Sequence, residues 1–232
     1  MKEVSLKNSR LEKILSGITK KVFNDEVIPE LTARVPHIKC TKIPALHPTS
    51  HEYFDKAKNE FEVPVWGYPR GVKGLGTGEF EARQSRYFFD IIHKDITKIK
   101  NYLGALDTAL CMFYPEDGYI GWHHNGNAEG YNILFSYSID GDGRFEYYDY
   151  KTKSIQQIQD KPGWNVKCGY YPSDKREPER VYWHAAATKN PRLSIAFIIN
   201  NRDMWINMID VITKGDYTPD VTEKQGPLSD LE

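Results

Sequence analysis

The chain has 232 residues, 40% of them hydrophobic and 13% aromatic, and its formal net charge is −1. This is the balance of a soluble globular protein that builds its core without cross-links. The near-zero charge excludes a general electrostatic attraction to nucleic acid or to an anionic membrane, so a nucleic-acid partner is possible but not favoured.

The cysteine pattern and the first residues of the chain indicate in which cellular compartment the protein is expected. Cys40, Cys111 and Cys168 lie far apart and form no CxxC pair, which argues against a disulfide framework and favours a reducing compartment. The charged first residues are not followed by an apolar signal core, and no apolar run approaches the length of a membrane span. We therefore expect a cytoplasmic protein with no membrane partner.

Residues 1–105 are expected to form a helical and loop region that packs on the barrel after it. Apolar residues recur at helical spacing in 9–28, where Ser9 is the expected N-cap, and again in 50–60 and 86–103. A Gly- and Pro-rich segment between the last two helices predicts a long loop with room for a hairpin.

From about residue 108 the hydrophobic period changes to two. Turn sequences rich in Gly, Asp and Pro separate several of the segments, and evenly spaced short strands of this kind favour a sandwich or a jelly roll. The eight strand candidates are 108–115, 119–124, 131–139, 143–150, 154–159, 164–171, 180–186 and 192–200.

The expected fold class is therefore α+β and mainly β, with a barrel core over 106–202. In 203–232 we expect a C-terminal helix that packs Trp205, Met208 and Ile212 on the barrel, followed by an acidic tail that we expect to be disordered.

The last strand candidate has two different faces. Leu193, Ile195 and alternate residues after them form an apolar face, whereas Arg192 and Ser194 begin a face of small residues. An Arg at this position suits a cavity that binds a carboxylate, although an exposed Arg at a strand end is the simpler explanation when the residue is judged alone. His184 and His123 lie on two other strand candidates, where each alone is most simply a structural histidine.

Taken in order, these residues carry a resemblance to a family. The segment "FYPEDGYIGWHHN" followed by "WHAAATKNPRLSIAF" resembles the Fe(II)- and 2-oxoglutarate-dependent oxygenases of the AlkB-like and prolyl-hydroxylase-like kinds, including relatives common in phage genomes, in which case the cytoplasm would be that of the host. Tyr114 precedes His123 by nine residues, as a Tyr does in that family, and His184 and Arg192 match its distal His and its later Arg. The resemblance covers about residues 106–200.

The resemblance implies a fold, cofactors and roles. The fold would be a double-stranded β-helix, a jelly roll of the cupin type, holding Fe(II) that works with 2-oxoglutarate and O2, and an assay would include ascorbate as reductant. The metal position would belong to His123, Asn125 and His184, and Arg192 would bind the far carboxylate of 2-oxoglutarate. Ser194, Tyr114 and Tyr137 are further candidates for cofactor contacts, and packing in an aromatic core explains each Tyr equally well.

Asn125 departs from the family pattern, which has His-x-Asp at this point. Its amide oxygen is a poorer ligand for a hard cation than a carboxylate. Asn125 either ligates iron weakly or leaves a coordination position for water or an anion. Alternatively, Glu129 or Asp117 supplies the carboxylate in its place, or Asn125 becomes Asp by deamidation at Asn125-Gly126. A retained fold with lost activity is the remaining alternative. If the strand continues, His124 points away from His123 and is no ligand.

The resemblance implies a substrate among protein side chains, nucleobases and small molecules. The segment 62–83 and the residues just after it mix basic with aromatic residues, which suits a flipped base, a peptide or a plain surface loop. The mixed residues are Trp66, Tyr68, Arg70, Lys73, Arg83, Arg86, Tyr87 and Phe88. Other metalloenzymes of the cupin type, such as isomerases, and a non-catalytic binding module on the same barrel remain alternatives. His37, Cys40, His47 and His51 form no complete zinc set.

Overall fold

The computed structural model describes residues 1–38, 46–59, 71–77, 82–125 and 128–215, and the side chains of 82–84 are not part of that description. Outside these residues lie Cys40, residues 62–70 of the predicted loop, Gly126 and the predicted acidic tail from 216 on. No helix in the described ranges is long and apolar enough to cross a membrane.

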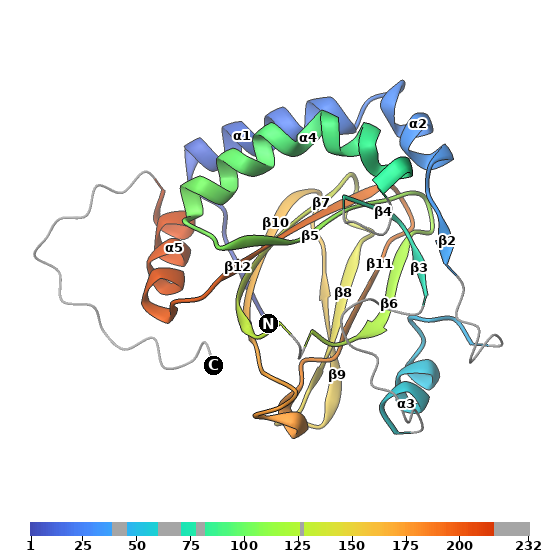
Figure 1. The fold of residues 1–232 in the computed structure, drawn as a ribbon, viewed down its shortest axis with the longest axis vertical. Helices are drawn as coiled ribbons and strands as arrows, with labels where there is room; N and C mark the ends of the chain where they lie inside the picture. Colours follow the sequence, from blue (N-terminus) through green and yellow to red (C-terminus); the bar gives the residue numbers. More distant parts are fainter. Residues whose placement is uncertain (39–45, 60–70, 78–81, 126–127, 216–232) are drawn as a thin grey trace, which may run out of the picture.

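Two antiparallel sheets face each other (Figure 1). In order across the first, sheet A, are β1 (Lys2–Val4), β10 (Gly163–Tyr171), β7 (Gly130–Ser138), β12 (Arg192–Ile199), β5 (Asp107–Tyr114) and β4 (Leu75–Gly76). In order across the second, sheet B, are β2 (His37–Ile38), β3 (Val72–Lys73), β6 (Tyr119–His123), β11 (His184–Ala187), β8 (Arg144–Asp149) and β9 (Ser154–Gln159).

The eight predicted strands form β5 to β12, and they are shared between the two sheets. The chain passes from sheet A to sheet B and back repeatedly, so β5 and β12, the first and last of the eight, lie side by side. This topology is consistent with a jelly roll of the cupin type. β11 begins only at His184, since Arg180 ends the 3₁₀ turn Pro178–Arg180 and residues 181–183 are not part of a strand.

The N-terminal region contributes strands as well as helices, which the sequence did not predict. β1 and β4 extend sheet A, while β2 and β3 extend sheet B. The hairpin allowed for in the long loop is wrong for the described part, because β3 pairs with β6 and β4 pairs with β5.

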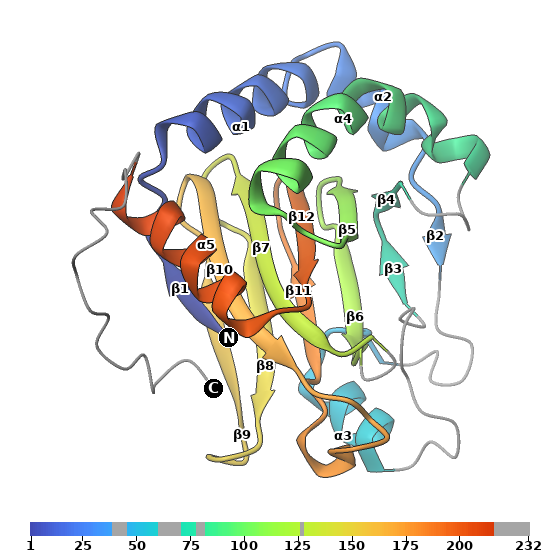
Figure 2. The same ribbon diagram turned by 60° about the vertical axis from the view of Figure 1, so that its left-hand side comes forward.

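Three helices cover the outer face of sheet A (Figures 1 and 2): α1 (Ser9–Val22), α4 (Ala82–Leu103) and α5 (Arg202–Lys214). The apolar spacing of α1 places one side chain per turn in the main core, namely Leu11, Leu15, Ile18 and Val22. The N-cap of α1 is Asn8 rather than Ser9, since the Asn8 side-chain oxygen accepts a hydrogen bond from the Leu11 backbone N–H at 2.9 Å.

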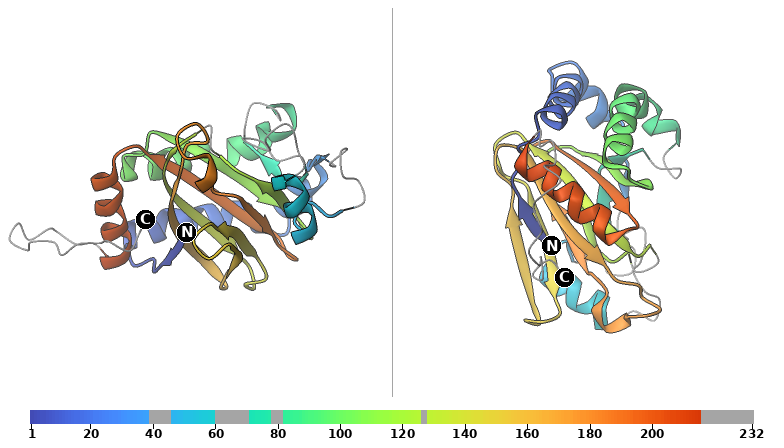
Figure 3. Two further views of the ribbon diagram at one scale, coloured as in Figure 1. Left: turned by 90° about the horizontal axis from the view of Figure 1, so that it is seen from below. Right: turned by 90° about the vertical axis from the view of Figure 1, so that its left-hand side faces the viewer.

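The outer face of sheet B is covered by α3 (His51–Asn59). Its Phe54 packs between Trp122 and Trp183, with ring centroids 4.7 and 5.9 Å away. The short helix α2 (Val27–Ala33) follows α1, and Figure 3 shows the layered arrangement from two further sides.

The alternation along β12 decides what lies between the sheets. Leu193 and Ile195 face the helices in the main core, as the sequence predicts. Arg192 and Ser194 face the space between the sheets and are 1% exposed. A cation is therefore enclosed inside the barrel, which requires partners.

Candidate functional site

A cavity of about 160 Å³ lies between the two sheets. Strands of both sheets line it, and its walls are mostly apolar, with polar groups at a few positions. Among the lining residues are Tyr114, His123, Asn125, His184, Arg192 and Ser194. The fold thus brings together six of the seven residues predicted for the site, although they come from four different parts of the chain.

The two histidines are directly opposite each other in the sheet. His123 ends β6, His184 begins β11, and the strand register pairs them, with ring centroids 4.2 Å apart. The Nδ1 atom of His123 lies 2.8 Å from the Gly121 carbonyl oxygen, and that of His184 lies 2.9 Å from the Tyr182 carbonyl oxygen. A carbonyl only accepts, so each Nδ1 donates, and Nε2 of each neutral ring keeps its lone pair.

Burial keeps both rings neutral. It lowers the pKa of His123 to about 4 and lowers the pKa of His184 well below its usual value, with a further decrease from the neighbouring ring. Two neutral imidazoles, each fixed through Nδ1 by a backbone carbonyl, are the form in which histidine binds a metal ion. This pair fits the metal that the resemblance implies.

Asn125 lies two residues after the end of β6 and lines the same cavity. Its backbone carbonyl accepts a hydrogen bond from the Ala128 N–H at 2.8 Å. The alternative in which Glu129 or Asp117 supplies the missing carboxylate gains no support from the lining of the cavity. Glu129 is bound by Tyr170 and Arg176, and neither acid lines the cavity.

Within the described ranges no three His, Cys, Asp or Glu side chains cluster closely enough to hold a metal ion. The protein groups at the candidate metal position are therefore two imidazoles and one neutral amide. Such a set has one negative charge fewer than a set with a carboxylate, so it binds a hard cation less strongly.

Arg192 is the other polar feature of the cavity. Its Nε donates to Asp160 Oδ2 at 2.6 Å and its Nη1 to Ser194 Oγ at 2.6 Å. Its Nη2 is buried and has no hydrogen-bond partner among the described residues, and the same holds for the Tyr114 hydroxyl, whose ring centroid lies 5.6 Å from the guanidinium. Burial raises the pKa of Tyr114 to about 12, so this hydroxyl remains a donor.

Two buried donors without acceptors are costly, and their presence in one cavity indicates a ligand that accepts from both. A carboxylate accepts several hydrogen bonds, and its negative charge is opposite to that of the Arg192 guanidinium. Arg192 and Tyr114 therefore fit the far carboxylate of 2-oxoglutarate, with Ser194 held against the guanidinium.

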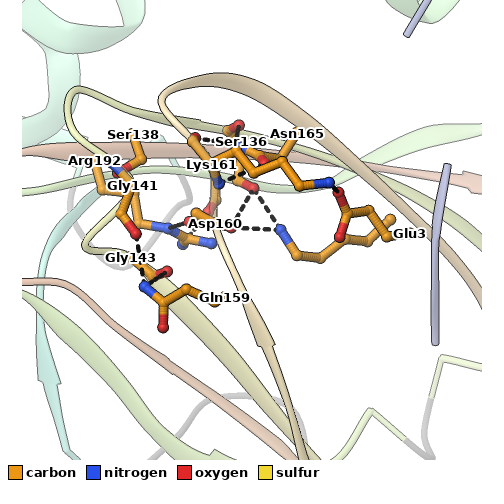
Figure 4. A network of polar contacts seen from close by, with 12 residues as sticks. Glu3, Ser136, Ser138, Gly141, Gly143, Gln159, Asp160, Lys161, Asn165 and Arg192 are labelled. Atoms are coloured by element: carbon orange, nitrogen blue, oxygen red, sulfur yellow. Dashed lines mark hydrogen bonds and ion pairs between the residues drawn. The ribbon is translucent and has the colours of Figure 1, made fainter. Parts of the chain in front are cut away.

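Sequence reasoning missed a buried ion network behind Arg192 (Figure 4). Asp160 Oδ1 accepts from Lys167 Nζ at 2.6 Å and from Ser136 Oγ at 3.2 Å, and the Asp160 and Lys167 side chains are both 0% exposed. Burial alone would raise the pKa of Asp160, but the charges of Arg192 and Lys167 outweigh it and hold this pKa at about 2. The sequence feature that could have indicated this network is Lys167, a charged residue between Val166 and Cys168 on the strand β10.

Tyr137 does not belong to the site. It lies on the face of β7 that is turned to the helices, where its ring packs 4.5 Å from Phe23 and 5.4 Å from Trp164. The prediction that it contacts the cofactor is corrected accordingly. His124 points away from His123, as expected, and its ring contacts Trp183 at 4.8 Å.

No family model matches the sequence, and no curated protein matches it. Solved structures do resemble the fold. A prolyl-4-hydroxylase from Pseudomonas putida is 12% identical, covers 81% of this chain and 100% of its own, and has a TM-score of 0.33. A prolyl hydroxylase from Trichoplax adhaerens, in complex with a hypoxia inducible factor peptide fragment, is 13% identical over 85% of this chain and 94% of its own, with a TM-score of 0.33.

An oxidoreductase of the 2OG-Fe(II) oxygenase family from Burkholderia pseudomallei is 12% identical over 75% of this chain and 91% of its own, with a TM-score of 0.31. Likenesses at this level do not bear on activity.

Proposed function

We propose that this protein is an Fe(II)- and 2-oxoglutarate-dependent dioxygenase with a double-stranded β-helix core, which hydroxylates or oxidatively demethylates a protein side chain or a nucleobase. The observation that carries the proposal is one cavity that unites two neutral, oriented imidazoles with a buried arginine whose Nη2 lacks an acceptor.

The residues divide the work between the two ends of the cavity. His123 and His184 would hold the iron through Nε2, with Asn125 beside them, and Arg192, Ser194 and Tyr114 would hold the far carboxylate of 2-oxoglutarate. When bound, iron and 2-oxoglutarate supply the oxidation of a substrate C–H bond by O2. The chain's own contribution is orientation and the exclusion of water, because the lining side chains are largely buried.

Asn125 leaves the metal position one charge unit more positive than a carboxylate would. Weaker iron binding through the amide oxygen, and a position open to water or an anion, both remain compatible with its place in the cavity. Deamidation to Asp would restore the acid, and intact-peptide mass spectrometry that finds no mass gain at this position in active protein would rule it out.

A second candidate function rests on the same residue. Because no acidic side chain joins the two histidines in the described residues, the barrel would also suit a metal-binding or non-catalytic module that has lost oxygenase activity. Binding measurements separate the candidates, since a ligand that binds only the folded state raises the melting temperature.

The decisive assay is succinate release from 2-oxoglutarate with Fe(II), O2 and ascorbate. We expect release by the parent and its loss in His123→Ala, His184→Ala and Arg192→Ala. His124→Ala is the matched control, because this neighbouring histidine lies outside the cavity. If the three variants bind metal and 2-oxoglutarate as the parent does, the assignment fails.

Melting curves with Mn(II) and 2-oxoglutarate test the alternatives in the same preparation. Stabilisation by both ligands supports the oxygenase. Stabilisation by Mn(II) alone indicates a metalloenzyme of another class, such as an isomerase, and stabilisation by neither indicates the non-catalytic module.

A second hollow of about 460 Å³ is the candidate entrance for the substrate. Its wall includes the Tyr182 ring, which stacks between Tyr147 at 5.3 Å and Tyr171 at 5.0 Å, and Tyr171 in turn stacks on His184 at 5.2 Å. A protein side chain, a base or a small molecule would meet aromatic rings here. Phe88, which the sequence offered as a stacking ring, is 0% exposed in the main core and is not available to a base.

A further inference from the structure

The ion network behind Arg192 has a surplus of positive charge. Arg192 and Lys167 supply two cations, Asp160 supplies one anion, and all three side chains are at most 1% exposed. A buried charge without a counter-ion is unfavourable, so this end of the cavity favours an additional anion.

We propose that Asp160 and Lys167 are positioning residues that orient Arg192 and keep this end of the cavity positive, so that it selects ligands with a second carboxylate. This inference rests on the proposed function, in which Arg192 binds the far carboxylate of 2-oxoglutarate.

Asp160 fixes the direction of Arg192. Asp160 Oδ2 accepts a hydrogen bond from Arg192 Nε at 2.6 Å, and Ser194 Oγ accepts one from Arg192 Nη1 at 2.6 Å. Arg192 Nη2 is then the guanidinium nitrogen without a partner among the described residues. Gly143 closes the space beside this pair, because a Cβ there would collide with Asp160 Oδ2 and would lie 2.8 Å from Arg192 Nε. The guanidinium therefore has little freedom to turn.

Lys167 determines the charge. An arginine paired with an aspartate alone is neutral overall and attracts an anion weakly. Lys167 Nζ occupies the other oxygen of Asp160 at 2.6 Å and is tied to Ser136 Oγ at 2.9 Å, so it offsets the aspartate. Nearby Lys161 does not add to this charge, since it pairs with Glu3 at 2.5 Å.

The shape of the cavity restricts the ligand to a small molecule. The lining of its 160 Å³ includes Leu110, Met112, Leu134 and Ala196. A short aliphatic chain with a carboxylate at the Arg192 end matches such walls. Lys167 is not a lining residue, so its influence is electrostatic and passes through Asp160 and Arg192.

The test compares two ligands that differ only in the far carboxylate, 2-oxoglutarate and 2-oxopentanoate, by calorimetry with Mn(II)-loaded protein. In Lys167→Met, we expect the affinity for 2-oxoglutarate to fall by roughly tenfold, because one unit charge is removed from a low-dielectric surrounding. The affinity for 2-oxopentanoate should not change. Lys161→Met is the matched control and should bind both ligands as the parent does.

A purely structural role would weaken both ligands together, and that result, or an unchanged affinity for 2-oxoglutarate, overturns the inference. The double variant Asp160→Asn with Lys167→Met decides the case if the single variant does not fold. It again leaves a net charge of one, so it should keep the parent's preference for 2-oxoglutarate, and loss of that preference also overturns the inference. A parent that binds neither ligand refutes the proposed function instead.

Discussion

The neutral histidine pair predicts that the metal-free protein loses stability in mild acid. Burial lowers the pKa of His123 from 6.5 to about 4, so the unfolded chain takes up a proton well before the folded chain does. The neutral ring therefore stabilises the fold fully above pH 6.5, and this stability is lost as the pH falls toward about 4.

The magnitude follows from the two pKa values. Between pH 7 and pH 5, proton uptake by His123 in the unfolded chain lowers the free energy of unfolding by about 2 kcal/mol. His184, whose pKa lies well below its usual value for the same reason, contributes a further loss of the same sign. Urea unfolding followed by tryptophan fluorescence, at constant ionic strength and with a chelator present, measures the change.

The comparison that tests the reasoning is parent against His123→Gln. The variant is less stable at pH 7 but should lose about 2 kcal/mol less than the parent on going to pH 5, because it lacks one of the two protonating groups. Parallel curves for the two proteins would refute the claim that His123 is buried and neutral.

Three substitutions test other parts of the cavity. Asn125→Asp should tighten Fe(II) or Mn(II) binding by about tenfold or more, since a carboxylate replaces an amide, and an unchanged metal affinity in a metal titration would show that the residue does not face the metal. Tyr114→Phe should weaken 2-oxoglutarate binding by roughly tenfold through loss of one hydrogen-bond donor, whereas the control Tyr137→Phe should leave the affinity unchanged. Equal effects of the two variants in calorimetry would contradict the placement of these tyrosines on opposite faces of sheet A. Gly143→Ala should lower the free energy of unfolding by about 1–3 kcal/mol because its Cβ collides with the ion network. Gly17→Ala, with nothing within 4 Å of its Cβ, is the control and should raise stability by about 0.5–1 kcal/mol, so similar shifts in the two melts would argue against the crowding.

Local pattern accounts for much of the barrel. A side chain on a strand alternates between two faces, so the sequence of β12 by itself separates Arg192 and Ser194 from Leu193 and Ile195. The same rule explains the failure at Tyr137. It alternates in phase with Phe135 on β7, so it shares the helix-covered face, while Ser136 faces the interior.

The ion network shows the limit of such reasoning. Asp160 follows β9 in a segment that reads as a turn, and Lys167 is one lysine among many. Only the pairing of β10 with β7, and of β7 with β12, brings both residues to Arg192. The energy of burying three charges depends on their mutual distances, which the linear sequence does not contain.

By itself, the sequence determined the strand-rich region and the two faces of β12, because strand period is a local property. The set of Tyr114, His123, His184 and Arg192 came from the resemblance of the sequence to an oxygenase family. The tertiary structure decided that these residues share one cavity and that each imidazole donates through Nδ1. It also decided that, among the described residues, no acidic side chain joins the two histidines. These features depend on which strands pair and on what their side chains meet across the barrel.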